Sequence, residues 1–239
     1  MDHHNGPGRT ILGLFFVKDV PAVGLLEGKH ANTDTIASSK WMNYPIFQTP
    51  FKQTETMNLS NHFLIAMPSM HDPIFGGTVV YLCEHNDYGA LGVVINRPME
   101  LTLEHLLEKL NLETEIPAPF EKPVMFGGPV QDDRGFVLHT PEVNFSSMLR
   151  ISDEVAFTTS RDILEAIASG SGPEKMLVSI GYAGWSAGQL EQEISHNGWL
   201  TVSADPSIIF DLPISQRYTA AMKLLGFDPN KLTYEVGHA

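Results

Sequence analysis

The chain has 239 residues and a formal net charge of −13, with 15 lysine and arginine residues against 28 aspartate and glutamate residues. It has no cluster of basic residues, and affinity for nucleic acid comes largely from lysine and arginine neutralising phosphates, so we expect no nucleic-acid partner. The single cysteine, Cys83, excludes an intramolecular disulfide and is consistent with a reducing cytoplasm. The apolar runs are too short to cross a membrane, so the composition predicts a cytoplasmic location and no membrane partner.

The pattern of the chain changes at Met57. Residues 1–56 carry five basic and five acidic residues and one short apolar run, which predicts a poorly ordered leader. The leader lacks the basic start and small-residue cleavage site of a secretory signal. Either Met57 is the real or an alternative start of the protein, or the leader is a peripheral arm. Residues 57–239 carry the whole net charge and are enough for one buried core, so we expect a single domain there.

Strand-length apolar runs open the body. They lie at 63–67, 77–84 and 90–96, and residues 85–89 are the predicted hairpin turn between the last two. In the second run, Val79 and Tyr81 point to one face and Val80 to the other, so both faces should be covered. Further strands are predicted at 124–130, 136–139, 155–158, 199–202 and 208–210, with 132–135 as a turn.

Helical spacing of apolar residues appears four times. Thr102 caps a predicted helix with a leucine stripe, and Thr159 or Ser160 caps a second helix over 161–168. A third helix follows Ser186 and ends at Asn197-Gly198, and a fourth lies near 213–225 with Gly226 as its C-terminal stop. Strands with about four helices distributed among them indicate an α+β fold, with a mixed, largely antiparallel β-sheet and the helices packed on it.

The stretch from Met176 to Leu200 begins with an apolar run of strand length, 176–182, and Gly181, Gly184 and Gly188 then predict a sharp turn. The stretch allows two incompatible interpretations. Its Gly184-Trp185-Ser186-Ala187-Gly188 segment matches the G-x-S-x-G motif that holds the catalytic serine of many hydrolases. Alternatively, Ser186 caps a helix, with its hydroxyl bonded to the Gln189 N–H and the Gln189 side chain bonded to the Ser186 N–H. His196 is too far along the same helix to reach Ser186, and His238 is the penultimate residue. The cap is therefore favoured over a catalytic Ser186.

Arginines near glycine-rich turns raise the possibility of an anion site. Such a site would combine turn N–H groups with guanidinium groups. The candidates are Arg97, Gly127, Gly128, Arg134, Arg161, Gly181 and Gly184. The alternative, which we favour, is that Asp132 or Asp133 pairs with Arg134 and that the other arginines make surface or backbone contacts. The histidines lack the spacing of metal ligands, so neither a metal nor another cofactor is expected.

Six phrases of the body are together more specific than any single motif. They are HFLIAMPSMHDPIF, YGALGVVINRP, VMFGGPV, DRGFVLHTP, TTSRDILEAI and GYAGWSAGQLEQEI. With these phrases the body resembles the YqgE/AlgH family of bacterial proteins. The resemblance implies a single cytosolic α+β domain and carries the frequent label of transcriptional regulator, without an established biochemical activity. The family pattern does not require serine at the position of Ser186, and it supplies no catalytic residues.

These observations favour a non-enzymatic binding or regulatory protein that affects transcription, if at all, indirectly. Its partner would be another protein or a small anionic ligand. The alternative is a serine hydrolase that uses Ser186.

Overall fold

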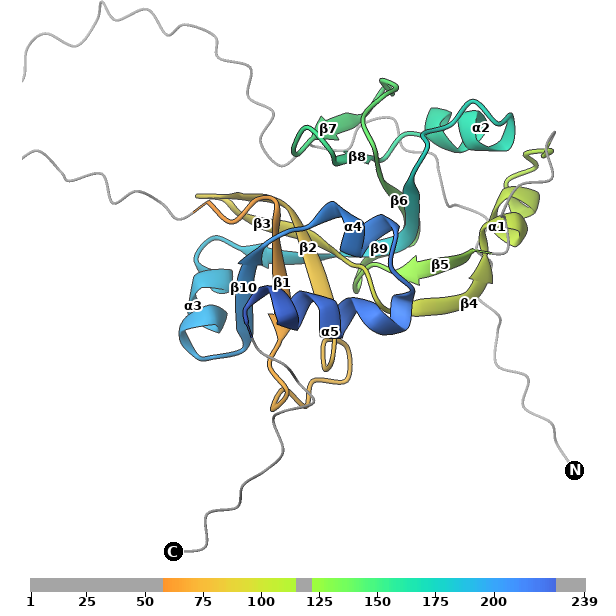
Figure 1. Ribbon diagram of the computed structural model, residues 1–239. Helices are drawn as coiled ribbons and strands as arrows, with labels where there is room; N and C mark the ends of the chain where they lie inside the picture. Colours follow the sequence, from red (N-terminus) through yellow and green to blue (C-terminus); the bar gives the residue numbers. More distant parts are fainter. Residues whose placement is uncertain (1–57, 115–121, 227–239) are drawn as a thin grey trace, which may run out of the picture.

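The computed structural model describes residues 58–114 and 122–226 (Figure 1). The predicted leader and the hydrolase candidate His238 lie outside the described residues. The strands are β1 (His62–Ala66), β2 (Val79–Asn86), β3 (Gly89–Val94), β4 (Pro98–Thr102), β5 (Pro123–Phe126), β6 (Val130–His139), β7 (Met148–Arg150), β8 (Ala156–Thr158), β9 (Met176–Ser186) and β10 (Trp199–Ser203). The helices are α1 (Leu103–Lys109), α2 (Asp162–Ala168), α3 (Gln189–Ser195), α4 (Pro206–Phe210) and α5 (Ile214–Leu224).

The strands form one curled sheet in the order β10-β1-β2-β3-β9-β6-β8-β7, and β5 joins β4 to β9. Every pair is antiparallel except β5 with β9, which is parallel. The long strand β9 pairs with β6 through its first half and with β3 through its second half. It therefore joins the two halves of the sheet. The predicted α+β class and the single domain are confirmed.

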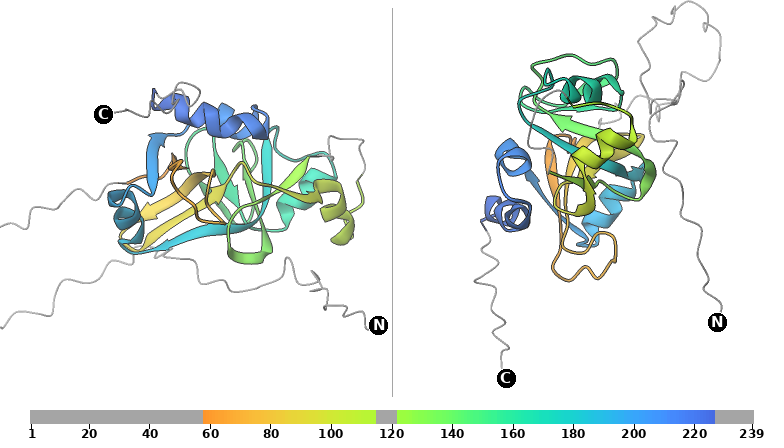
Figure 2. Two further views of the ribbon diagram at one scale, coloured as in Figure 1. Left: turned by 90° about the horizontal axis from the view of Figure 1, so that it is seen from below. Right: turned by 90° about the vertical axis from the view of Figure 1, so that its right-hand side faces the viewer.

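Three apolar clusters hold the helices on this sheet. Helices α4 and α5 cover one face of β1 and β2, while α1 and α2 pack on β5, β6 and β9. The third cluster joins Leu190 of α3 to Val80 and Leu82 on the other face of β2. Figures 1 and 2 show α3 at one end of the molecule and α1 with α2 at the other. The prediction that both faces of β2 are covered is confirmed.

Several local predictions are confirmed in detail. The Thr102 hydroxyl caps α1 by accepting from the His105 N–H at 3.3 Å. Gly226 follows α5 with a positive φ of 78°, as a C-terminal stop requires. Cys83 is buried within β2, and burial raises the pKa of its thiol. No helix within the described residues is long and apolar enough to cross a membrane.

Other local predictions were wrong. Residues 132–135 are an irregular stretch inside β6 and not a turn, because the register against β9 shifts between Val130 and Gly135. Residues 206–210 form helix α4, which the Asp205 side chain caps at the Ser207 N–H, so the strand predicted at 208–210 is absent. The predicted 85–89 turn is shorter, since Asn86 pairs with Gly89 across the hairpin. Neither Thr159 nor Ser160 caps α2; the N-cap position is Arg161, without a side-chain cap bond.

Candidate functional site

A groove of about 450 Å³ lies beside α3. Strand β9, helix α3, the β1–β2 loop and the first residue of β10 form it. We call it the tryptophan groove. Its lining residues are Met70, Asp72, Phe75, Pro129, Gly184, Trp185, Gln189, Gln192, Glu193, His196, Gly198 and Trp199. The groove has the size of a small-molecule or side-chain binding site.

The two tryptophans and Glu193 form the wall of the groove. The indole N–H groups of Trp185 and Trp199 donate to the same carboxylate oxygen, Oε2 of Glu193, at 2.9 and 2.8 Å. Phe75 packs against both indole rings, edge to face against Trp199 with ring centroids 5.5 Å apart. Only 7% of Trp185 and 3% of Trp199 is exposed. Buried indole N–H groups need acceptors, and Glu193 supplies one acceptor for both.

Gln189 links the carboxylate of Glu193 to Ser186. The Ser186 N–H and hydroxyl both donate to Oε1 of Gln189, at 3.0 and 3.1 Å. This fixes the orientation of the Gln189 amide, whose NH₂ group then donates to Oε1 of Glu193 at 3.0 Å. The phrase GWSAGQLEQE therefore encodes one hydrogen-bonded network that holds a carboxylate at the groove.

The predicted capping box is half correct. The Gln189 side chain does reach the Ser186 N–H, as expected. The reciprocal bond is absent, because α3 begins after Gly188, which occupies the N-cap position with a left-handed φ of 74° and no side-chain cap bond. The predicted glycine turn was also wrong: β9 continues to Ser186, and Gly184 pairs with Leu91 inside the sheet. The stop at Asn197-Gly198 is confirmed, since the Gly198 N–H donates to the Glu193 carbonyl.

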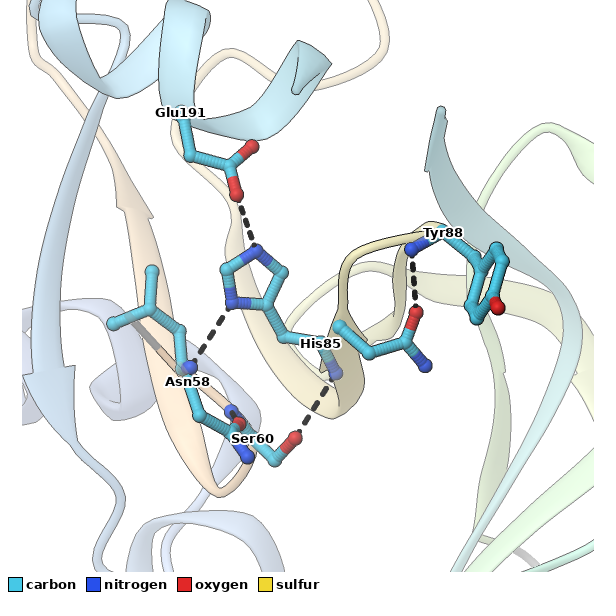
Figure 3. Close-up of polar contacts among 7 residues, drawn as sticks. Asn58, Ser60, His85, Tyr88 and Glu191 are labelled. Carbon is cyan, nitrogen blue, oxygen red and sulfur yellow. Dashed lines mark hydrogen bonds and ion pairs between the residues drawn. The ribbon is translucent and has the colours of Figure 1, made fainter. Parts of the chain in front are cut away.

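A second carboxylate fixes the other side of α3 (Figure 3). Glu191 and Glu193 flank the buried Leu190, because successive helical residues are rotated by about 100°. Glu191 accepts from Nε2 of His85 at 2.9 Å, and His85 is 4% exposed. Nδ1 of His85 accepts from the Leu59 N–H at 3.0 Å, so the ring proton lies on Nε2. His85 thereby joins α3 to the first described residues of the chain.

Ser186 has none of the contacts of a catalytic serine. Its hydroxyl bonds to the Gln189 amide, and no histidine in the described ranges is hydrogen-bonded to it. The His196 ring lies at the far end of α3, where Nδ1 bonds to the Gln192 carbonyl at 2.8 Å. A nucleophile requires a base that removes its proton, and an amide carbonyl is not such a base. Nothing in the geometry of residues 58–114 and 122–226 supports the hydrolase alternative.

The candidate glycines lie together where two backbones cross. A Cβ atom on Gly128 would be 2.2 Å from the Tyr182 carbonyl carbon, and one on Gly181 would be 2.2 Å from the Gly128 carbonyl oxygen. The Gly127 N–H donates to the Ile180 carbonyl at 2.8 Å. Close backbone contact explains the glycines at these positions. Gly184 is apart from them and lines the tryptophan groove.

The candidate arginines are held by different segments. The Arg97 guanidinium donates to the Pro73 and Ile74 carbonyls, the backbone contact that the favoured alternative predicts. Arg161 pairs with Glu165 at 3.0 Å and donates to the Leu110 carbonyl. Arg134 lies in the irregular part of β6, and no ion pair joins it to Asp132 or Asp133 in the described chain. The anion site therefore stays a prediction.

A second groove, of about 490 Å³, lies between α4 and the loops that follow β6, β7 and α2. Carboxylates outnumber basic side chains in its lining, whose charged residues are Glu142, Arg150, Asp153, Glu154, Glu174, Lys175, Asp205 and Asp211. Lys175 pairs with Asp211 at 2.8 Å. No group of three or more metal-ligating side chains occurs within the segments that the structure describes.

The sequence pattern pointed to Trp185, Ser186, Gln189 and Gly184, but not to the network that joins the first three to Glu193. It missed Trp199 and Glu193, which come to the groove from a separate strand and from the helix. It also placed His85 in a loop, whereas the ring is buried. The signal that was available is the i, i+4 spacing of Gln189 and Glu193, which places both on one helix face.

The fold and the groove define a class of protein: a single α+β domain with a curled, largely antiparallel sheet and one aromatic groove beside a short helix. Comparison with known proteins identifies the family. Residues 63–230 match a family model described as AlgH-like. The chain belongs to the AlgH-like family, as its resemblance to the YqgE/AlgH proteins implied.

Individual relatives support this membership. The chain is 55% identical to a UPF0301 protein of Chromobacterium violaceum, over 77% of this chain and all of the relative. It is 58% identical to one of Thiobacillus denitrificans, with the same coverage. The solution structure of AlgH from Pseudomonas aeruginosa, at 53% identity, matches 79% of this chain and all of that one with a TM-score of 0.64. A Corynebacterium diphtheriae protein of 21% identity shares the fold, with a TM-score of 0.57 over 69% of this chain and 86% of that one.

Proposed function

We propose that this is a cytosolic, non-enzymatic binding protein, which recruits a protein partner or small ligand to the tryptophan groove and influences transcription only indirectly. The observation that carries this proposal is the network of Trp185, Trp199, Gln189 and Glu193, which holds polar groups in fixed positions at the wall of a groove. Fixed groups that need little reordering favour binding, because less conformational freedom is lost when the ligand arrives.

The same network argues for binding over catalysis. The Ser186 hydroxyl is used to orient Gln189, and the Gln189 amide is used to orient Glu193. Each side chain thus has a positioning role that requires no proton transfer. The acidic body also disfavours a direct contact with DNA, because phosphates would be repelled.

A pair of matched substitutions tests the proposal. Gln192→Trp places a large ring at an exposed position of the groove. Gln216→Trp makes the same change at an exposed position of α5, away from the groove. The full chain, with and without each substitution, is immobilised and incubated with a bacterial lysate and its small-molecule extract.

We expect the unchanged chain and Gln216→Trp to retain a protein or metabolite that Gln192→Trp does not retain. Circular dichroism of both variants shows whether they are folded. If Gln192→Trp is folded and retains every binding partner, the groove is not the binding site.

A further inference from the structure

We propose that the tryptophan groove binds a lysine side chain on the surface of a partner protein, with Glu193 receiving the ammonium group. This inference rests on the proposed function, because it assigns the chemistry of the occupant of the same groove.

The groove carries negative charge that no cation of the described chain neutralises. Glu193 takes part in none of the ion pairs found within residues 58–114 and 122–226, and its three hydrogen-bond donors are the neutral indoles and the Gln189 amide. A second carboxylate, Asp72, accepts from the Ile74 and Phe75 N–H groups through one oxygen. The lining contains these two carboxylates and neither lysine nor arginine, so its charge favours a cation and repels an anion.

The hydrogen bonds already made by Glu193 favour ammonium over guanidinium. An ionised carboxylate has about four acceptor positions. Two indole N–H groups occupy Oε2 and one amide N–H group occupies Oε1, which leaves one position on Oε1. The paired N–H groups of arginine need both oxygens, whereas an ammonium group can donate singly and turn its other N–H groups elsewhere.

The rest of the groove suits the remainder of a lysine. Met70 and Phe75 are half-buried apolar side chains that can pack against its methylene groups. Gln189 and Gln192 are exposed and form a polar rim. One lysine side chain fills only part of the groove, whose volume is about 450 Å³. The remaining contact must come from residues around the lysine, which favours a protein partner over a free amine.

The experiment titrates the isotopically labelled full chain with capped tripeptides. The indole N–H signals of the groove are assigned with Trp185→Phe and Trp199→Phe and then followed by nuclear magnetic resonance. The central residue of the acetyl-Gly-X-Gly-amide peptide is lysine, arginine, Nε-acetyl-lysine or glutamate, and butylammonium represents a free amine.

We expect the lysine peptide to shift both signals and to bind more tightly than the arginine peptide and butylammonium. Loss of the charge in the Nε-acetyl-lysine peptide should weaken binding by about tenfold, a change typical of a removed ion pair that is partly desolvated. Glu193→Gln should weaken lysine binding to a similar degree. Glu100→Gln removes one charge at an exposed site in β4 and should leave binding unchanged.

Three outcomes overturn the inference. Equal binding of the Nε-acetyl-lysine peptide, tighter binding of the glutamate peptide, or butylammonium binding as tightly as the lysine peptide would each contradict it. The peptide titration tests only which group occupies the groove. If it fails but Gln192→Trp still loses its cellular partner, the proposed function is retained. If Gln192→Trp loses no partner, both proposals fail.

Discussion

Trp185 and Trp199 meet edge to face with ring centroids 6.0 Å apart, although their strands are four positions apart in the sheet order. In a flat sheet, four steps of about 4.8 Å would separate these strands by roughly 19 Å. The rings meet because the sheet curls and both side chains lie on the face that α3 covers. The tryptophan groove is thus a product of sheet curvature, and Glu193 of α3 fixes the two rings at its wall.

Glu193→Ala should destabilise the fold by about 2 to 3 kcal/mol, because two nearly buried indole N–H groups would lose their acceptor. Glu193→Gln keeps an oxygen that can accept from both indoles, so it should cost less than Glu193→Ala, although its NH₂ group would face the NH₂ group of Gln189. Urea denaturation of the two variants measures the difference. Equal stability of the two variants would show that the indoles do not depend on this acceptor.

Neither the unchanged chain nor Ser186→Ala should be labelled by a fluorophosphonate probe, because the Ser186 hydroxyl is bonded to an amide and not to a base. The hydroxyl bond to Gln189 is lost, but the Ser186 backbone N–H still donates to the same oxygen. The stability cost should therefore be below about 1 kcal/mol, the usual size of one hydrogen bond. Covalent labelling of the unchanged chain that disappears in Ser186→Ala would revive the hydrolase alternative.

Local patterns in the sequence predicted much of this fold. The stripe of α1, the alternation along β2 and the Asn197-Gly198 stop depend on neighbouring residues, and each is confirmed. Predictions failed where distant pairing decides the conformation. Glycines at the end of β9 were interpreted as a turn, but the neighbouring strand β3 keeps this segment extended. The short strands β4 and β7 exist through their partners and have no strong pattern of their own.

The site was less predictable than the fold for the same reason. Trp199 reaches the groove only because the sheet curls, and the curl cannot be deduced from residue spacing. His85 has a polar neighbourhood in the sequence, which suggested a turn, whereas its burial depends on contacts with Leu59 and Glu191. Long-range contacts of this kind leave no periodic signal.

Gly181→Ala should be far more destabilising than Gly188→Ala. Both glycines have a left-handed φ, of 73° and 74°, which costs an alanine about 1 to 2 kcal/mol. At Gly188 nothing lies within 4 Å of the added Cβ atom, so this cost is the whole effect. At Gly181 the Cβ atom would also be 2.2 Å from the Gly128 carbonyl oxygen, and the backbone crossing must open. Thermal unfolding of the two variants compares them directly, and similar melting temperatures would contradict the close crossing.

His139 should make the fold less stable in mild acid. Its ring is fully buried, with Nδ1 bonded to the Thr140 carbonyl and Nε2 to the Thr158 hydroxyl, each at 2.8 Å. Burial lowers the pKa of His139 below its ordinary value of 6.5, although the bond to Thr140 acts in the opposite direction. Below pH 6.5 the unfolded chain therefore binds a proton that the folded chain resists, and stability falls as the pH decreases toward the lowered pKa.

His139→Gln isolates this contribution, since glutamine can donate to Thr140 and accept from Thr158 but does not titrate. The free energy of unfolding of both proteins is measured in urea at pH values from 7 to 5. We expect it to fall more steeply with decreasing pH in the unchanged chain than in His139→Gln, because the other titrating groups are common to both. Parallel curves over this range would mean that His139 binds a proton equally well in the folded and unfolded states.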